Sequence, residues 1–155
     1  MLEQAFNEVY TKFKLNFYRR IFRRFQDREA SLTAVETFCV EAIYALGRPS
    51  INELARFLEI SAPNATYKVG SLVRKGYIRR VQSTTDKREY YLEVSDKFLT
   101  YYGVSYDYLK TVTDRIRTRF SPAEVEQLER MLTIVSRELM SEIPVRAADS
   151  KEDAR

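Results

Sequence analysis

The sequence has no histidine, no tryptophan and a single cysteine among its 155 residues. Zinc and copper sites are built mainly from imidazole and thiolate ligands, so we expect no metal site. A lone cysteine forms no internal disulfide, which is typical of the reducing cytoplasm. The usual agents of catalysis are missing too, because there is no histidine, no glycine-rich phosphate loop and no evident carboxylate pair in an apolar setting. The sequence therefore predicts a protein that is not an enzyme and has no cofactor.

Long uninterrupted apolar segments are also missing. No stretch reaches the length of a transmembrane helix, and the first ten residues, MLEQAFNEVY, lack the cationic start and apolar run of a signal peptide. We therefore expect a cytoplasmic protein with no membrane partner. Its 26 Lys and Arg residues against 22 Asp and Glu residues are a mild excess that leans toward polyanionic partners.

What the sequence does contain is helical periodicity towards both ends. Large apolar residues recur every three or four positions over residues 2–25, which predicts a long first helix. The same spacing returns over residues 98–120, and a capping box at residues 121–124, Ser-Pro-Ala-Glu, opens a last helix. Residues 144–155 are small, charged and unpatterned, so we expect a flexible tail.

The centre of the sequence has the signals of a helix-turn-helix followed by a hairpin. Capping boxes at residues 33–36 and 50–53 start two helices, and Ser61 can cap a third helix that ends at Gly76. Two short alternating segments within residues 78–94 are separated by a polar stretch, which predicts a β-hairpin.

These elements predict a mainly α fold with a small β-hairpin wing. We expect a winged helix-turn-helix DNA-binding domain at residues 31–95, flanked by long N- and C-terminal dimerisation helices at residues 1–30 and 96–143. The expected dimer contacts are apolar positions of the outer helices: Leu2, Phe6, Val9, Leu128, Leu132, Val135 and Leu139.

The third central helix, residues 61–75, is the candidate recognition helix. Its apolar positions Ala65, Val69 and Leu72 share one side, which leaves a polar side facing outward. An α-helix fits the DNA major groove, where Asn reads adenine, Tyr contacts a phosphate or a thymine methyl, and Lys neutralises phosphate. An ordinary solvated face is the alternative interpretation. The candidate DNA contacts on this helix are Ser61, Pro63, Asn64, Thr66, Tyr67, Lys68, Ser71 and Arg74.

The hairpin tip adds Asp86, Lys87 and Arg88 to the candidate DNA contacts, with the wing spanning residues 79–94. The two cations are placed to reach the neighbouring minor groove, where the potential is most negative over narrow A·T stretches. Asp86 repels phosphate, so we expect it to orient Arg88 through a charge-assisted hydrogen bond. An ordinary exposed turn is the alternative.

Aromatic residues are concentrated in the outer helices. Phe13, Phe17, Tyr18, Tyr101 and Tyr102 are candidates for a pocket that takes a small aromatic or lipophilic effector. Such stripes are more often core packing or dimer contact, and both interpretations stay open.

The single cysteine, Cys39, lies in an apolar helical run. This position favours burial as a small hydrophobic side chain. Reversible oxidation of an exposed thiolate is the alternative, and it would make the protein a redox sensor.

Three segments carry a resemblance to a known family. Glu53-Leu-Ala55, Leu72-Val-Arg-Lys-Gly-Tyr-Ile78 and the wing tip Asp86-Lys-Arg88 stand in the order and spacing of the MarR (multiple antibiotic resistance regulator) family of bacterial winged-helix regulators, which the sequence resembles. The likeness extends to the outer helices in layout, because family members place one helix before the winged domain and two after it.

The resemblance implies a homodimer that binds a pseudo-palindromic operator in double-stranded DNA. Recognition positions fall on Pro63, Asn64, Thr66, Tyr67 and Lys68, and Arg88 enters the minor groove. Two residues depart from the family pattern: Tyr67 stands where a basic residue is expected, and Glu93 belongs to a segment that replaces the usual Leu-Thr. We expect a ligand-responsive repressor; the alternative is a winged-helix protein-interaction module without sequence-specific DNA binding.

Overall fold

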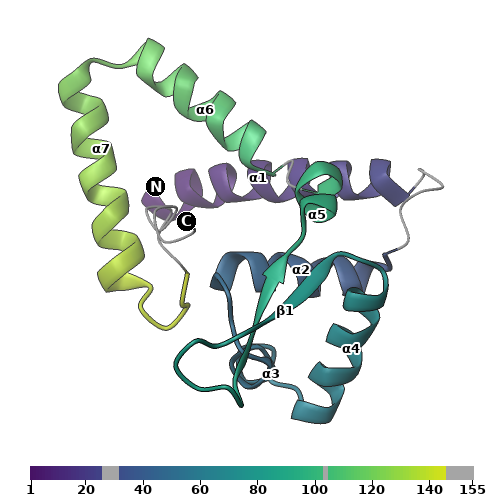
Figure 1. Cartoon of the computed structure of the whole chain (residues 1–155). Coiled ribbons are helices and arrows are strands. Elements are labelled where there is room, and N and C mark those ends of the chain that lie inside the picture. The colour runs from purple at the N-terminus through teal and green to yellow at the C-terminus, as the bar shows by residue number, and fades with distance from the viewer. Residues whose placement is uncertain (26–31, 103–104, 146–155) are drawn as a thin grey trace. The chain divides into compact units, whose positions relative to one another are not determined.

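The structure is a computed structural model that describes residues 1–25, 32–102 and 105–145. Its helices and strands follow one another along the chain as shown in Figure 1. They are α1 (Leu2–Phe25), α2 (Ala34–Leu46), α3 (Ile51–Phe57), α4 (Ala62–Arg74), β1 (Ile78–Gln82), β2 (Tyr90–Val94), α5 (Asp96–Tyr102), α6 (Ser105–Arg119), α7 (Pro122–Ile134) and a π-helical turn, η1 (Val135–Leu139). The predicted fold class, mainly α with a small β-hairpin, is confirmed.

The described residues form two compact units. The winged unit comprises residues 32–101, and the arm unit comprises residues 1–25, 102 and 105–143. The winged unit contains the helices and hairpin predicted for the DNA-binding domain, together with residues 96–101 of α5, which were predicted to belong to the dimerisation region. The predicted tail lies outside the described residues apart from its first two positions, 144 and 145.

Local capping explains where three of the helices begin. The predicted capping boxes are present at the starts of α2, α3 and α7, each pairing a hydroxyl with the N3 amide and a glutamate with the N-cap amide. In α2, for example, the Glu36 amide donates to Thr33 Oγ1 over 3.2 Å, and the Thr33 amide donates to Glu36 Oε2 over 2.8 Å. These reciprocal bonds satisfy amide groups that the helix itself leaves without partners.

The core of the winged unit is made by one side of each of its elements. Apolar side chains that are at most 1% exposed are contributed by α2, α3, α4, β2 and α5. They include Val40, Ile43, Leu54, Val69, Leu72, Leu92 and Phe98. Burial of each such side chain stabilises the fold by about 1.5–3 kcal/mol, so this core fixes the position of α4.

The hairpin is joined to the helices along one edge. β1 and β2 are antiparallel, with Ile78 opposite Val94 and Arg80 opposite Leu92. The edge of β2 that faces away from β1 is bonded to the segment before α3, because the Leu92 amide donates to the Pro49 carbonyl over 2.9 Å. β2 also packs against α2 and α3, and β1 packs against α4. The wing therefore projects from a fixed base.

The arm unit has much less buried surface. Helix α1 contacts α6, where the Phe13 and Tyr108 rings meet edge to face with centroids 5.5 Å apart. Only Asn16 and Ile21 are buried among the described residues of this unit, and α7 contains no buried residue. In the part of the chain that the structure describes, no helix is long and apolar enough to cross a membrane.

Candidate nucleic-acid interface

Helices α3 and α4 are joined by a tight turn. The backbone of Glu59 has a φ of 53°, and the Ile60 amide donates to the Ala55 carbonyl over 3.0 Å, which closes the end of α3. Ser61 then caps α4 by accepting from the Asn64 amide over 3.3 Å. The turn brings the start of α4 directly after the end of α3, which is the arrangement of a helix-turn-helix.

The first half of α4 presents a polar surface to solvent. The Tyr67 side chain is 74% exposed, and Ser61, Pro63, Asn64, Thr66 and Arg74 are exposed as well. Lys68 is half-buried, at the margin of this surface. The Thr66 hydroxyl donates to the Ala62 carbonyl within the helix over 2.9 Å, so its oxygen is left to accept a further bond.

Ser71, a candidate DNA contact, is half-buried and bonds to a residue of α2. Its hydroxyl donates to Glu36 Oε1 over 2.7 Å, and Lys75 Nζ lies 2.8 Å from Glu36 Oε2. Burial alone raises the pKa of Glu36, but the bonds from Lys75, Thr33 and Ser71 outweigh it and lower that pKa to about 2. The helical wheel placed Ser71 correctly beside Tyr67 but could not show that α2 approaches there.

The wing tip is folded on itself around two side chains. Ser83 is buried and its hydroxyl accepts from the amides of Thr85 and Asp86, each over 3.2 Å. Asp86 Oδ1 accepts from the Arg88 amide over 2.9 Å, whereas the Arg88 Nε atom is 4.0 Å away. The prediction that Asp86 orients the Arg88 guanidinium by a hydrogen bond is therefore wrong, because the aspartate holds the backbone of the loop. The Arg88 side chain is 95% exposed.

Two other cations near the hairpin, Arg48 and Arg79, are neutralised. Glu93 lies between Arg48 and Arg79, with N–O distances of 2.7 Å and 2.9 Å. Glu93, which departs from the family pattern, thus forms salt bridges with both arginines. Among the described residues, no salt bridge involves Lys68, Arg74 or Lys87, so with Arg88 they make up the basic side of this surface.

The predicted effector residues are not gathered into a described pocket. Phe13 packs on Tyr108, and the rings of Phe17 and Tyr18 are 6.1 Å apart. The side chains of Tyr101 and Tyr102 lie outside the described residues. Neither of the grooves on the described arm helices uses any of these five residues.

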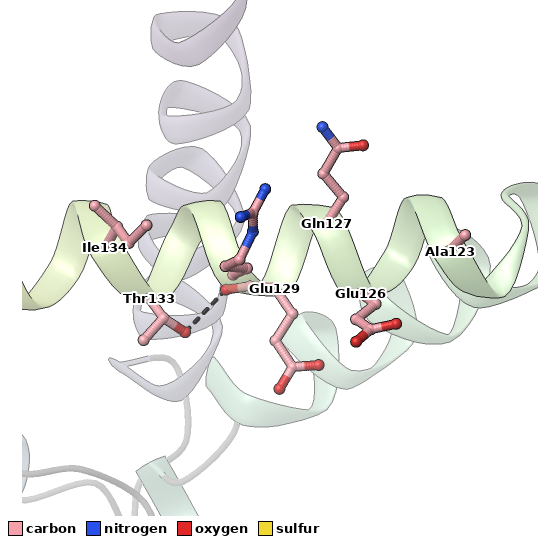
Figure 2. A pocket seen from close by; sticks show the side chains of 7 residues that line it. Ala123, Glu126, Gln127, Glu129, Thr133 and Ile134 are labelled. Carbon is pink, nitrogen blue, oxygen red and sulfur yellow. Dashed lines mark hydrogen bonds between the residues drawn. The ribbon is translucent and has the colours of Figure 1, made fainter.

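Figure 2 shows the larger of these grooves, along one side of α7. Its labelled side chains are mostly polar and include Glu126, Gln127, Glu129 and Thr133, whose hydroxyl donates to the Glu129 carbonyl over 2.8 Å. Every lining residue comes from α7 itself. The groove is thus one exposed face of a helix, and it identifies the polar side of α7.

The predicted dimer contacts occupy other positions of α1 and α7, and positions of η1. Leu2 and Leu139 are 84% and 69% exposed, and Phe6, Val9 and Leu132 are each more than half exposed. Leu128 and Val135 are half-buried. All seven remain accessible in the single chain.

Cys39 is buried in the winged unit. Burial raises the pKa of its thiol, so the thiolate required for oxidation is disfavoured. The geometry thus favours the packing interpretation over redox sensing. No group of ligating side chains that could hold a metal ion is present among the described residues.

Comparison with known proteins finds a family match in the winged unit and two similar transcriptional regulators. Residues 32–90 match the model of the MarR family. The chain is 27% identical over 137 residues to YkoM, an HTH-type transcriptional regulator of Bacillus subtilis, across 83% of this chain and 89% of YkoM. It is also 27% identical over 86 residues to the HTH-type transcriptional regulator BilQ of Clostridioides difficile, across 56% of this chain and 58% of BilQ.

Solved structures show the same fold. A mutant of MepR from S. aureus has a TM-score of 0.63 at 16% identity, across 90% of this chain and 97% of that one. A MarR family protein from Bacillus stearothermophilus has a TM-score of 0.61 at 15% identity, across 89% and 92%. In its capped helix-turn-helix, its wing and the match over residues 32–90, the winged unit is similar to the MarR family.

Proposed function

We propose that the protein is a homodimeric transcription regulator that binds double-stranded DNA at a pseudo-palindromic operator. In this proposal α4 enters the major groove and the wing enters the adjacent minor groove. The observation that carries the proposal is the exposed, polar first half of α4, presented directly after the tight turn from α3. The match of residues 32–90 to the MarR family model and the names of YkoM and BilQ as transcriptional regulators support it.

The exposed residues of α4 suit base and phosphate contacts. Asn64 has the amide that pairs with the N6 and N7 positions of adenine, and Tyr67 has a ring for a thymine methyl and a hydroxyl for a phosphate. Pro63 and the methyl group of Thr66 add apolar surface on the same helix. Lys68 and Arg74 supply positive charge along the same helix, which would release counterions from the DNA backbone.

The wing supplies the second contact. Arg88 is the most exposed side chain of the ion pairs in the described residues, and the loop that carries it is held by Ser83 and Asp86. A guanidinium on such a loop suits a narrow minor groove, where the potential is most negative. Lys87 lies beside it and suits a backbone phosphate.

Dimerisation is proposed from the apolar positions that the single chain leaves accessible on α1 and α7. Soluble proteins rarely expose contiguous apolar surface of this kind unless it meets a partner, and a second copy of the chain is the partner that operator symmetry requires.

The solved structure of FabT from Streptococcus pneumoniae in complex with DNA, which has a TM-score of 0.54 at 20% identity across 91% of this chain and 99% of that one, has the same fold. Control by a small aromatic or lipophilic effector, and repression as the outcome, stay predictions.

The proposal is tested by selecting bound sequences from a random duplex pool with the full chain. The expected result is a symmetric motif with two half-sites about one helical turn, roughly 10 base pairs, apart. Arg88→Ala should then weaken binding to the selected duplex and lower the salt slope by about one unit. Arg130→Ala, which removes the same charge from the polar side of α7, is the control and should leave the slope unchanged.

The outcomes separate the two interpretations of the fold. Absent or salt-insensitive DNA binding would contradict the proposal and favour a protein-interaction module. An asymmetric selected motif would contradict the dimer, and an unchanged slope in Arg88→Ala would contradict the role of the wing.

A further inference from the structure

The last turn of α4 and the residues after it, 71–76, receive side chains from two other elements of the winged unit. From α2, the Glu36 carboxylate accepts from the Ser71 hydroxyl over 2.7 Å and from Lys75 Nζ over 2.9 Å and 2.8 Å. The same carboxylate accepts from the Thr33 amide over 2.8 Å. One side chain thus joins the first turn of α2 to the last turn of α4.

The second set of contacts comes from the start of α5. Lys97 Nζ donates to the Lys75 carbonyl over 2.9 Å and lies 4.4 Å from the centre of the Tyr77 ring. The Ser95 hydroxyl donates to the Gly76 carbonyl over 2.6 Å. Carbonyls at the end of a helix have no partner within it, and a cation placed there is favoured by the helix dipole.

These two elements have special places in the chain. α2 is the first helix of the winged unit, and α5 is the last, so they adjoin the segments by which the chain enters and leaves this unit. Side chains of both elements contact residues 71–76, at the end of α4 that is opposite to Asn64 and Tyr67. A small rotation of α2 or α5 therefore has to move or break these bonds.

We propose that Glu36 and Lys97 are positioning residues that hold α4 in the orientation that reads DNA sequence. This inference rests on the proposed function. Neither residue needs to touch DNA. Lys75 is neutralised by Glu36, so its charge serves the link to α2 and not a phosphate.

The chemistry favours positioning over simple stabilisation. The Glu36 carboxylate is 13% exposed and accepts several bonds, and two of its partners, Ser71 and Lys75, lie in the last turn of the recognition helix and at its end. An equivalent capping glutamate, Glu53 at the start of α3, bonds among the described residues only to its own N-cap residue Ser50. The chain thus contains the same local motif with and without the link to α4.

The experiment measures the affinity of each variant for the selected duplex and for a random duplex at one salt concentration. Glu36→Gln keeps the shape of the side chain but removes its charge, and it should lower affinity for the selected duplex about tenfold. Affinity for the random duplex should stay equal or rise, because the variant removes one negative charge from the winged unit. Lys97→Met should also lower the ratio of the two affinities.

Glu53→Gln is the matched control, because it removes a capping glutamate of the same unit without a bond to α4, and it should keep the ratio of the wild type. Ser71→Ala is a milder variant for use if Glu36→Gln does not fold, and it should lower the ratio by a smaller factor. A thermal unfolding curve of each variant establishes that it is folded.

An equal loss of both affinities, or no loss of either, would overturn the inference, because a merely structural role changes the folded fraction and not the ratio. A wild-type protein that does not distinguish the two duplexes would overturn the proposed function and the inference with it. The two failures are therefore distinguishable by the wild-type measurement alone.

Discussion

The winged unit and the arm unit differ in how they bury apolar side chains. All buried apolar residues among those described belong to the winged unit except Ile21. Large side chains of the arm unit, such as Leu2, Phe6 and Leu132, stay more than half exposed. The winged unit thus closes its own core, whereas the arm helices have apolar positions that only a further surface can cover.

Local sequence signals do not explain this difference. The capping box of α7 has the same bonds as those of α2 and α3, so helices start equally well in both units. The units differ in what lies opposite the apolar side of each helix. Stability of the arms should therefore depend on association, and that of the winged unit should not.

The largest expected effect comes from placing charge on the apolar side of α7. Leu128→Asp combined with Leu132→Asp should abolish the dimer, since an unpaired buried charge costs about 3–5 kcal/mol. Sedimentation of the full chain at several concentrations measures this. The winged unit should keep its fold, seen as retained protection of its core amides against hydrogen exchange.

Ala123→Asp combined with Thr133→Asp adds the same charges to the polar side of α7, seen in Figure 2, and should remain dimeric. A Leu128→Asp/Leu132→Asp variant that still sediments like the wild type would remove the proposed interface. A variant that unfolds throughout would show instead that the two units share one cooperative core.

The second expected effect concerns how the stability of each unit depends on pH. Glu41 on α2 is half-buried and has neither a hydrogen bond nor a salt bridge with any described residue, and its burial raises the pKa from 4.5 to about 7. The folded state therefore binds this proton more tightly than the unfolded state does. Its contribution to stability is complete below pH 4.5 and is lost as the pH rises through 7.

Glu41→Gln should thus leave stability near that of the wild type at pH 4 and raise it at pH 8, by at most about 3 kcal/mol. Urea unfolding at the two pH values measures this. Glu124 in the arm unit is the comparison, because its hydrogen bonds with Ser121 lower the pKa. Glu124→Gln should lower stability at neutral pH and not in acid. Equal pH profiles for Glu41→Gln and the wild type would show that the carboxylate is solvated.

The sequence patterns predicted the structural features that depend on interactions between residues close together in the chain. Helix starts and the exposure of Asn64 and Tyr67 follow from capping and periodicity, and the structure has them. The link from Glu36 to Ser71 and Lys75 was not predicted, because it joins residues 35 and 39 positions apart in the chain. A capping glutamate has the same local signal whether or not a second helix approaches it.

The role of Asp86 was mistaken for a similar reason. Opposite charges two residues apart suggested a side-chain pair, but in a tight loop the carboxylate reaches the Arg88 amide first. Likewise, the aromatic stripe of the outer helices was compatible with packing and with a pocket. Periodicity specifies which side of a helix is apolar and leaves open what that side meets.

The smallest effect concerns strain, which is also confined to the winged unit among the described residues. Arg48 and Glu59 are the only non-glycine residues there with positive φ. The end of α4 has the same closing bonds as the end of α3, with Gly76 at the position where α3 has Glu59. A side chain in this left-handed region costs about 1–2 kcal/mol, whereas glycine has no such penalty but loses more entropy on folding.

Glu59→Gly should therefore stabilise the protein by about 0.5–1 kcal/mol, as the relief of strain exceeds the added entropy of the unfolded chain. Glu59→Ala removes the same carboxylate but keeps the strained backbone, so it should give no such gain. The midpoints of urea unfolding of the two variants decide between them. Equal midpoints would mean that the turn is not strained, and that the winged unit does not use its larger core to hold an unfavourable backbone in front of the recognition helix.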